Sequence, residues 1–135
     1  MTVFLDACAV IYRVDAVEPW LAKMTTVFAR LHSGPTAPGV AVSRLSLLEC
    51  RVQPLRKNDR PLLAAYQEFF SSPGLQIVGL SAEVVERATI VRAQTNLPTP
   101  DALQAASALS IADEVHFVTS DTKFKLVAGL NVELL

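Results

Sequence analysis

The sequence has 135 residues, of which 51% are hydrophobic and 19% are charged, and its formal net charge is −1. These values predict a globular chain with a sizeable core, and they exclude a general electrostatic attraction to nucleic acid. The apolar runs are too short to span a bilayer, the first residues lack the pattern of a signal peptide, and two cysteines do not make a disulfide framework. We therefore expect one domain over residues 1–135, located in the cytoplasm, with free thiols.

Short apolar runs alternate with longer amphipathic segments along the chain. The short runs predict strands at 2–5, 39–42, 75–80, 115–119 and 131–135. The longer segments predict helices at 7–14, 19–31, 45–55, 62–70, 81–95 and from residue 100 onward, with a short helical turn at 121–127. Because strands and helices alternate in this way, we expect a parallel sheet with helices on both faces.

The segment that begins at Leu97 predicts an unusual helix. We expect Thr99 to be its N-cap and Pro100 its first residue, which places Asp101 in the first turn. The residues that follow are mostly small and apolar, so the helix is predicted to be buried. Only three side chains from 102 to 112 are uncharged and polar: Gln104, Ser107 and Ser110. A carboxylate at the mouth of such a helix needs a partner, although capping alone also explains an Asp in a first turn.

Three other carboxylates fall where strands end or helices begin. Asp6 directly follows the first strand, and Asp121 follows the strand at 115–119. At 100° per residue, Glu49 borders the apolar face that Leu45, Leu48 and Val52 are predicted to form. In an open α/β sheet, ligands bind outside the carboxyl ends of the strands. We therefore expect these carboxylates and Asp101 to lie at one end of the sheet.

Each of these acids also has an ordinary structural interpretation. Asp6 fits a helix N-cap, and Asp121 fits the start of a turn. Ser46 and Glu49 have the spacing of a capping box, with Ser43 as the other candidate cap of that helix. These alternatives stay open for each residue taken alone. Four acids at one end of a sheet favour a functional site.

Clustered carboxylates repel one another, and a hard divalent cation removes the repulsion. Mg²⁺ prefers oxygen ligands and is usually held by few carboxylates together with water and substrate phosphate. His32 and His116 have no neighbouring thiol or imidazole in sequence, so no zinc pattern competes. The chemistry that fits is metal-assisted hydrolysis of a phosphodiester bond.

The sequence resembles PIN-domain ribonucleases, and more narrowly the VapC-like toxins of bacterial toxin–antitoxin pairs. The resemblance spans nearly the whole chain, in the family's order, and it rests on four segments: Phe4–Ala7, Ser46–Glu49, Pro100–Ala106 and Val118–Phe124. It implies a three-layer α/β/α fold with a central, mainly parallel sheet.

The same resemblance implies a Mg²⁺- or Mn²⁺-dependent endoribonuclease that acts as a toxin. Asp6, Glu49, Asp101 and Asp121 would be both the metal ligands and the catalytic acids, with Thr119 as an accessory polar group. The family also implies a homodimer and a small cognate antitoxin. One position departs from the family, which commonly has Ser, Asn or Thr where this chain has Cys8; a thiol is a weaker hydrogen-bond donor and can be oxidised.

RNA binding needs local positive charge, and Arg13 and Arg44 are the candidate substrate contacts. We also consider a catalytically silent PIN-like module that binds proteins, and a nuclease directed at DNA. A phosphoacceptor receiver domain is disfavoured, because Asp6 is followed by Ala7 instead of a second acid.

Overall fold

A computed structural model describes residues 1–135 of the protein, and its centre is one sheet of five parallel strands. The strands are β1 (Thr2–Leu5), β2 (Gly39–Ser43), β3 (Leu75–Val78), β4 (Val115–Thr119) and β5 (Val132–Leu134). Their order in the sheet is β3-β2-β1-β4-β5, so the chain builds outward from β1 on one side and then on the other. The carboxyl ends of β1 and β4 therefore meet at the point where the strand order reverses, which is where open α/β sheets bind ligands.

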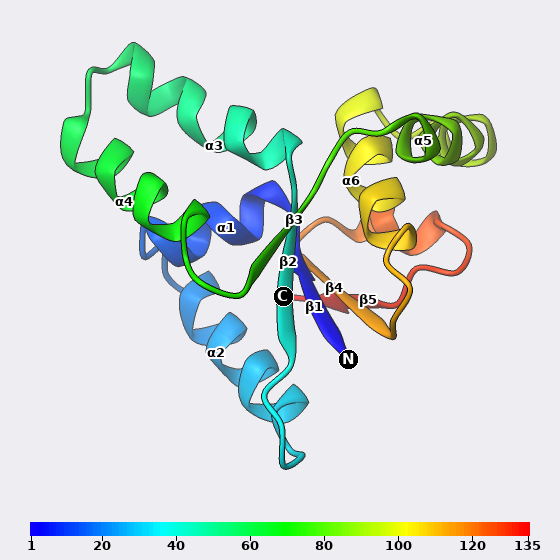
Figure 1. The fold of residues 1–135 in the computed structure, drawn as a ribbon, viewed down its shortest axis with the longest axis horizontal. Coiled ribbons are helices and arrows are strands. Elements are labelled where there is room, and N and C mark those ends of the chain that lie inside the picture. Colours follow the sequence, from blue (N-terminus) through cyan, green and yellow to red (C-terminus); the bar gives the residue numbers. More distant parts are fainter.

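Helices cover both faces of this sheet, as predicted. They are α1 (Ala7–Val14), α2 (Trp20–Leu31), α3 (Leu45–Arg56), α4 (Arg60–Phe70), α5 (Ala82–Thr95) and α6 (Thr99–Leu109), with a 3₁₀ helix η1 at Thr122–Leu126. Figure 1 shows α1 to α4 on one side of the sheet and α5 and α6 on the other. The fold is thus the expected three-layer α/β/α arrangement. None of the helices has both the length and the apolar character that a membrane crossing requires.

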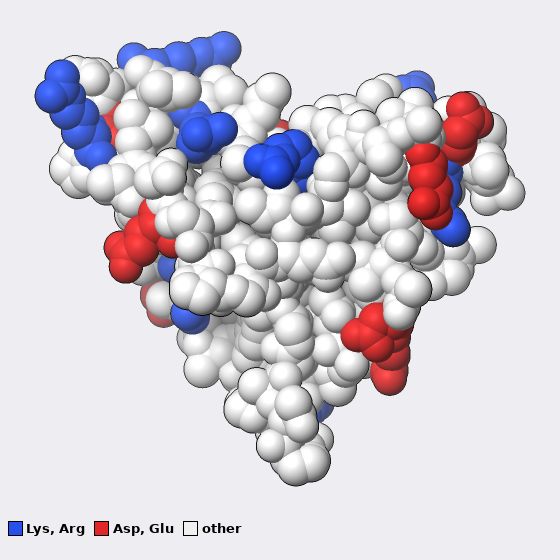
Figure 2. All heavy atoms as spheres, viewed as in Figure 1, with Lys and Arg blue, Asp and Glu red and all other residues white.

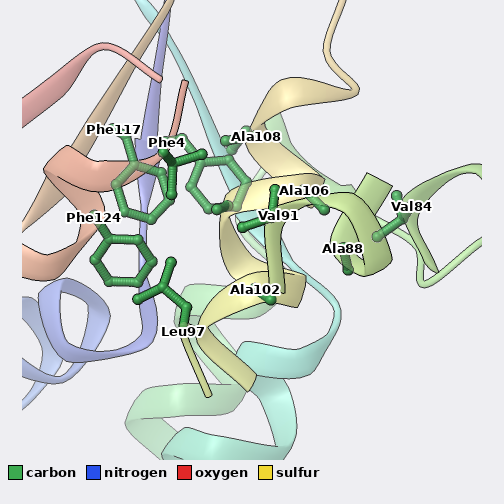
Figure 3. Packing of buried hydrophobic residues seen from close by; sticks show 13 residues of the cluster. Phe4, Val84, Ala88, Val91, Leu97, Ala102, Ala106, Ala108, Phe117 and Phe124 are labelled. Atoms are coloured by element: carbon green, nitrogen blue, oxygen red, sulfur yellow. The ribbon is translucent and has the colours of Figure 1, made fainter. Parts of the chain in front are cut away.

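The strands bury both of their faces, which divides the core in two. Val3, Leu5 and Val118 face α1 to α4, whereas Phe4 and Phe117 face α5 and α6. In the second layer the Phe4 and Phe117 rings lie nearly parallel with centroids 5.4 Å apart, and Phe124 packs on Phe117 at 4.7 Å (Figure 3). This alternation explains why the strands are short, continuous apolar runs in the sequence.

The small residues of α6 allow it to lie close against the sheet. Its fully buried alanines are Ala102, Ala105, Ala106 and Ala108, all at most 1% exposed. They pack beside the Phe4 and Phe117 rings, so little space separates this helix from the strands (Figure 3). The prediction of a buried helix is confirmed.

The predicted cap of α6 is wrong, and of the two candidate caps of α3, Ser43 and Ser46, only Ser43 bonds a backbone amide at the start of the helix. Thr99 is the first residue of α6, not its N-cap, and its hydroxyl accepts a hydrogen bond from Arg92 at 2.9 Å instead of capping the helix. Ser46 does not form a capping box, because it lies inside α3; Ser43 Oγ accepts the amide hydrogen of Leu45 at 3.1 Å in its place. In both cases the hydroxyl accepts a hydrogen bond from the side chain of another helix, from Arg92 of α5 at Thr99 and from Gln104 of α6 at Ser46, each at 2.9 Å.

The predicted inner face of α3 is also wrong. Ser46, Cys50 and Pro54 are buried, whereas Leu48 and Leu55 are 60% and 64% exposed. The buried residues follow a four-residue spacing that an apolar count overlooks, because one of them is polar. Glu49 lies beside this true inner face and is only partly exposed. Its predicted position at the edge of the core is therefore correct, although for a different reason.

We predict that α6 tolerates no larger side chain at Ala106, which is fully buried. Ala106→Leu should lower the free energy of unfolding by about 1–3 kcal/mol, because the added carbons have no space in a closely packed layer. Urea denaturation measures this. The matched control is Ala93→Leu on α5, where the side chain is exposed and the expected change is within about 0.5 kcal/mol. Equal stability of the two variants would contradict close packing at Ala106.

Candidate functional site

Four acidic side chains approach the carboxyl end of the sheet from separate elements. Asp6 lies between β1 and α1, and Asp121 lies between β4 and η1. Glu49 comes from α3 in one helical layer, and Asp101 comes from the first turn of α6 in the other. The strand order reverses between β1 and β4, so Asp6 and Asp121 follow the two strands that meet at the point where open α/β sheets bind ligands.

Asp6 is the most buried of the four, at 4% exposure. Its Oδ1 accepts the backbone amide hydrogen of Ala9 at 2.9 Å, which caps α1, and its Oδ2 accepts the hydroxyl hydrogen of Thr119 at 2.5 Å. Burial nevertheless raises the pKa of Asp6, because these hydrogen bonds do not fully replace the lost water. Asp6 therefore caps a helix and also presents a carboxylate that a positive charge would stabilise.

Cys8 makes a hydrogen bond to this carboxylate. Its Sγ donates to Asp6 Oδ1 at 2.9 Å and lies 3.6 Å from Ser120 Oγ. Burial and the neighbouring Asp6 raise the pKa of Cys8 to about 11, which keeps it in the thiol form that can donate. The thiol thus supports Asp6 despite the departure from the residues common in the family.

Thr119 is fully buried and joins two parts of the site. While its hydroxyl donates to Asp6, its oxygen accepts the backbone amide hydrogen of Asp121 at 3.0 Å. Thr119 therefore fixes the turn that carries Asp121 relative to the Asp6 carboxylate. Because Thr119 has no exposed surface, it affects the site through its hydrogen bonds to Asp6 and Asp121.

Glu49 has one hydrogen-bond partner, the side chain of Gln104. Gln104 Nε2 on α6 donates to Glu49 Oε1 at 3.0 Å and to Ser46 Oγ at 2.9 Å. Burial raises the pKa of Glu49, the Gln104 hydrogen bond lowers it, and Asp101 and Asp6 raise it further. Glu49 is thus oriented by a residue from the opposite helical layer.

Asp101 makes no hydrogen bond within the chain, unlike an aspartate that caps its own helix. Burial raises the pKa of Asp101, Lys123 lowers it and Asp121 raises it. Asp121 caps η1 by accepting the amide hydrogen of Lys123 at 2.9 Å, as its structural interpretation predicted, and Lys123 Nζ lies 3.6 Å from its Oδ2. Asp101 is therefore the acid most available to a ligand, and Asp121 is the one already paired.

The four acids interact through their charges, but they do not form a closed ligand set. Asp101 raises the pKa of both Asp6 and Glu49, and Asp121 raises that of Asp101. No three Asp, Glu, His or Cys side chains lie close enough together to make a preformed metal site. We use the name acidic pocket for these four residues, Asp6, Glu49, Asp101 and Asp121, among which charge repulsion is only partly relieved.

The two predicted substrate contacts lie in different places. Arg44 is exposed at the start of α3, directly after the carboxyl end of β2, whereas Arg13 is at the far end of α1 and lines a separate apolar cavity. Figure 2 shows further Lys and Arg side chains along the part of the molecule that α3 and α4 form. Those of the α3–α4 arm are Arg51, Arg56, Lys57 and Arg60. This geometry favours Arg44 over Arg13 as a contact to a ligand in the pocket.

The sequence predicted no role for Gln104 and only a helix cap for Ser46, yet both belong to the site. Gln104 is 2% exposed and Ser46 is fully buried, and together they connect α6 to α3 next to Glu49. A signal for Gln104 was present, because a lone amide in a helix of small apolar residues needs a buried partner. Nothing in the sequence indicated which partner.

Comparisons with known proteins agree with this fold. A family model described as "PIN domain" matches residues 3–130. None of the curated proteins compared with the chain matches it significantly.

Several solved structures are similar in fold. The VapBC2 complex of Rickettsia felis, bound to a DNA fragment from its promoter, has a TM-score of 0.73 at 20% identity, covering 99% of this chain and 98% of that one. VapC20 of Mycobacterium tuberculosis, described as a sarcin–ricin loop cleaving toxin, has a TM-score of 0.72 at 18% identity, with 95% of each chain covered. VapBC-1 of nontypeable Haemophilus influenzae has a TM-score of 0.69 at 12% identity, covering 99% and 98%.

These likenesses cover nearly the whole chain, and at such low identity they establish the fold. The family model covers the strand ends, α3 and α6, and so includes all four acidic residues of the pocket. The chain belongs to the PIN domain family.

Proposed function

We propose that the protein is a metal-dependent endoribonuclease that hydrolyses RNA phosphodiester bonds and acts in the cytoplasm as the toxin of a toxin–antitoxin pair. The observation that supports it best is the open acidic pocket of Asp6, Glu49, Asp101 and Asp121 at the carboxyl end of the sheet. Three of these carboxylates have pKa values raised by burial and by one another, so a cation would stabilise them.

The donor set fits Mg²⁺ or Mn²⁺. All four side chains offer hard carboxylate oxygens, and Mg²⁺ needs only one or two of them because it keeps several waters and binds substrate phosphate. An open pocket without three converging ligands suits that mode of binding better than it suits zinc. We assign Asp6, Glu49, Asp101 and Asp121 as the residues that would hold the ion.

The chain's own residues would prepare the pocket for a phosphodiester. Thr119 and Cys8 hold the Asp6 carboxylate rigidly, so its position does not depend on the ligand. Asp101, which has no partner in the chain, is left available. A divalent cation bound here supplies activation of water and neutralisation of phosphate charge.

RNA would reach the pocket beside Arg44 and the basic α3–α4 arm. Because the net charge is only −1, we expect few phosphate contacts and a modest dependence of binding on salt. Selectivity would then come from RNA shape and from unstacked bases. A nuclease directed at DNA would hydrolyse the same kind of phosphodiester bond. Comparing RNA with DNA as substrate distinguishes this alternative from an endoribonuclease.

The cognate antitoxin is the proposed partner, and a second feature of the surface suits it. A cavity of about 720 Å³ lies between α2, the residues that lead into β2, and the α4–β3 connection. Its lining is largely apolar and includes Met24, Phe28, Phe69 and Leu75. Two of the similar structures are toxin–antitoxin complexes of Rickettsia felis and Klebsiella pneumoniae. We propose that an apolar segment of the antitoxin occupies this cavity.

Cleavage is tested with purified, partner-free protein and a mixed RNA pool, in Mg²⁺, in Mn²⁺ and in chelator. We expect cleavage with either metal, none with chelator, and none by Asp101→Asn, because that change removes the most available carboxylate. The control is Asp15→Asn, the same change at an exposed aspartate at the end of α1. Single-stranded DNA of matched sequence runs in parallel.

Cleavage of DNA alone would favour the DNA-directed alternative. No cleavage of either nucleic acid, together with no Mn²⁺ binding by calorimetry, would favour a catalytically silent binding module.

The raised pKa values predict how stability depends on pH. A carboxyl whose pKa is higher in the folded state stabilises the fold below its unfolded pKa, and this stabilisation is lost as the pH rises through the folded value. Without metal, Asp101→Asn should therefore raise the Tm at about pH 7.5, with a smaller gain near pH 4. Mg²⁺ should raise the wild-type Tm more at about pH 7.5 than at about pH 5.

Differential scanning calorimetry measures both effects, with Asp15→Asn as the control that should follow the wild type. A metal-free Asp101→Asn that melts below the wild type at neutral pH would show that the acids do not repel one another.

The antitoxin cavity is tested by growth of cells that co-express the toxin and its cognate antitoxin. Thr25 lines the cavity, whereas its neighbour Thr26 does not, and both are exposed. Thr25→Arg places a long charged side chain in the cavity, so the antitoxin should no longer restore growth. Thr26→Arg should still be neutralised. If the antitoxin neutralises both variants equally, it binds elsewhere.

A further inference from the structure

Gln104 is the only side chain with a buried polar atom that has no hydrogen-bond partner. Its Nε2 donates to Ser46 Oγ at 2.9 Å and to Glu49 Oε1 at 3.0 Å, while its Oε1 is buried without a partner. Buried polar groups in folded proteins almost always have partners, because an unpaired one destabilises the fold. This exception therefore needs an explanation.

The charge of Glu49 determines which way the Gln104 amide points. An ionised carboxylate only accepts hydrogen bonds, so it must face the amide nitrogen and not the amide oxygen. Turning the amide around would place two oxygens against each other at Glu49. The unpaired Oε1 is thus a direct consequence of presenting the nitrogen to Glu49.

The Gln104 hydrogen bond also connects the two helical layers. Glu49 lies on α3 and Gln104 on α6, on opposite faces of the sheet, and Glu49 has no other hydrogen-bond partner in the chain. An apolar residue at position 104 would fill the same space and remove the unpaired oxygen, but it would also take the Gln104 hydrogen bond away from the buried Ser46 hydroxyl. A second polar contact joins α6 to β2, where Ser107 Oγ lies 3.2 Å from Ser43 Oγ. Neither of these serines is hydrogen-bonded to an acidic side chain.

We propose that Gln104 is a positioning residue, which holds the Glu49 carboxylate in the acidic pocket so that it can take part in binding the divalent cation. The proposal rests on the proposed function, because it gives Gln104 a role only through the metal site. In this role the buried Gln104 amide leaves its oxygen without a hydrogen bond and uses its nitrogen to orient the Glu49 carboxylate.

The test is Mn²⁺ binding by calorimetry, together with thermal melting of the metal-free protein. Gln104→Met keeps a side chain of similar size and removes the unpaired oxygen together with the hydrogen bonds to Glu49 and to Ser46. We expect Mn²⁺ affinity to fall by about 10- to 100-fold, as for other residues that orient a metal ligand. The Tm should stay close to that of the wild type, because removal of the unpaired oxygen offsets the lost hydrogen bond to Ser46.

Ser107→Ala is the matched control, since it removes the other buried polar contact of α6 and should leave Mn²⁺ affinity within about twofold. A double-mutant cycle with Glu49→Gln shows whether Gln104 acts through Glu49: adding Gln104→Met to Glu49→Gln should cause little further loss of affinity.

The outcomes separate the two proposals. If the wild type binds Mn²⁺ and Gln104→Met binds it equally well, or if Gln104→Met fails to fold or melts well below the wild type, the positioning role is overturned and the proposed function stands. If the wild type neither binds Mn²⁺ nor cleaves RNA, the proposed function is overturned and this role with it.

Discussion

The burial of the Asp6 carboxylate at the end of β1 is the constraint on which the rest of the site depends. At 4% exposure this group has lost most of its water, and the chain replaces it with hydrogen bonds from Ala9, Cys8 and Thr119. These bonds come from α1 and from the end of β4, so they also fix the two elements that flank the reversal in strand order. Burial still raises the pKa of Asp6, which means that the fold holds a carboxylate whose ionised form is destabilised in the absence of a positive partner.

Helix α6 brings the opposite layer into the same site. Its buried alanines lie close against Phe4 and Phe117 (Figure 3). The first turn of the helix carries Asp101, whose charge acts on Asp6 at the end of β1. One helical turn further along, Gln104 crosses to α3 and holds Glu49. The small residues of α6 thus serve packing and function together, because a helix held further from the sheet would present neither side chain to the pocket.

The strands, the buried helix and the end of the sheet at which the acids lie could be predicted, because each follows from local periodicity and from the rule for parallel sheets. The exposure of Leu48 and the partners of Thr99 and Ser46 could not, since they depend on tertiary contacts that outweigh local preference. The bond between Gln104 and Glu49 joins residues far apart in the chain, and a single sequence does not reveal such a pair. The ligand roles of the four acids stay predictions.

The most direct test of the central idea, that these four acids form one divalent-metal site, is a crystal structure of the protein soaked in Mn²⁺ and measured for anomalous scattering. The account predicts an anomalous peak in the pocket, within bonding distance of a carboxylate oxygen of Asp6 or Asp101, at about 2.0–2.2 Å as expected for hard oxygen ligands. A peak confined to other acids on the surface, with none in the pocket, would contradict it.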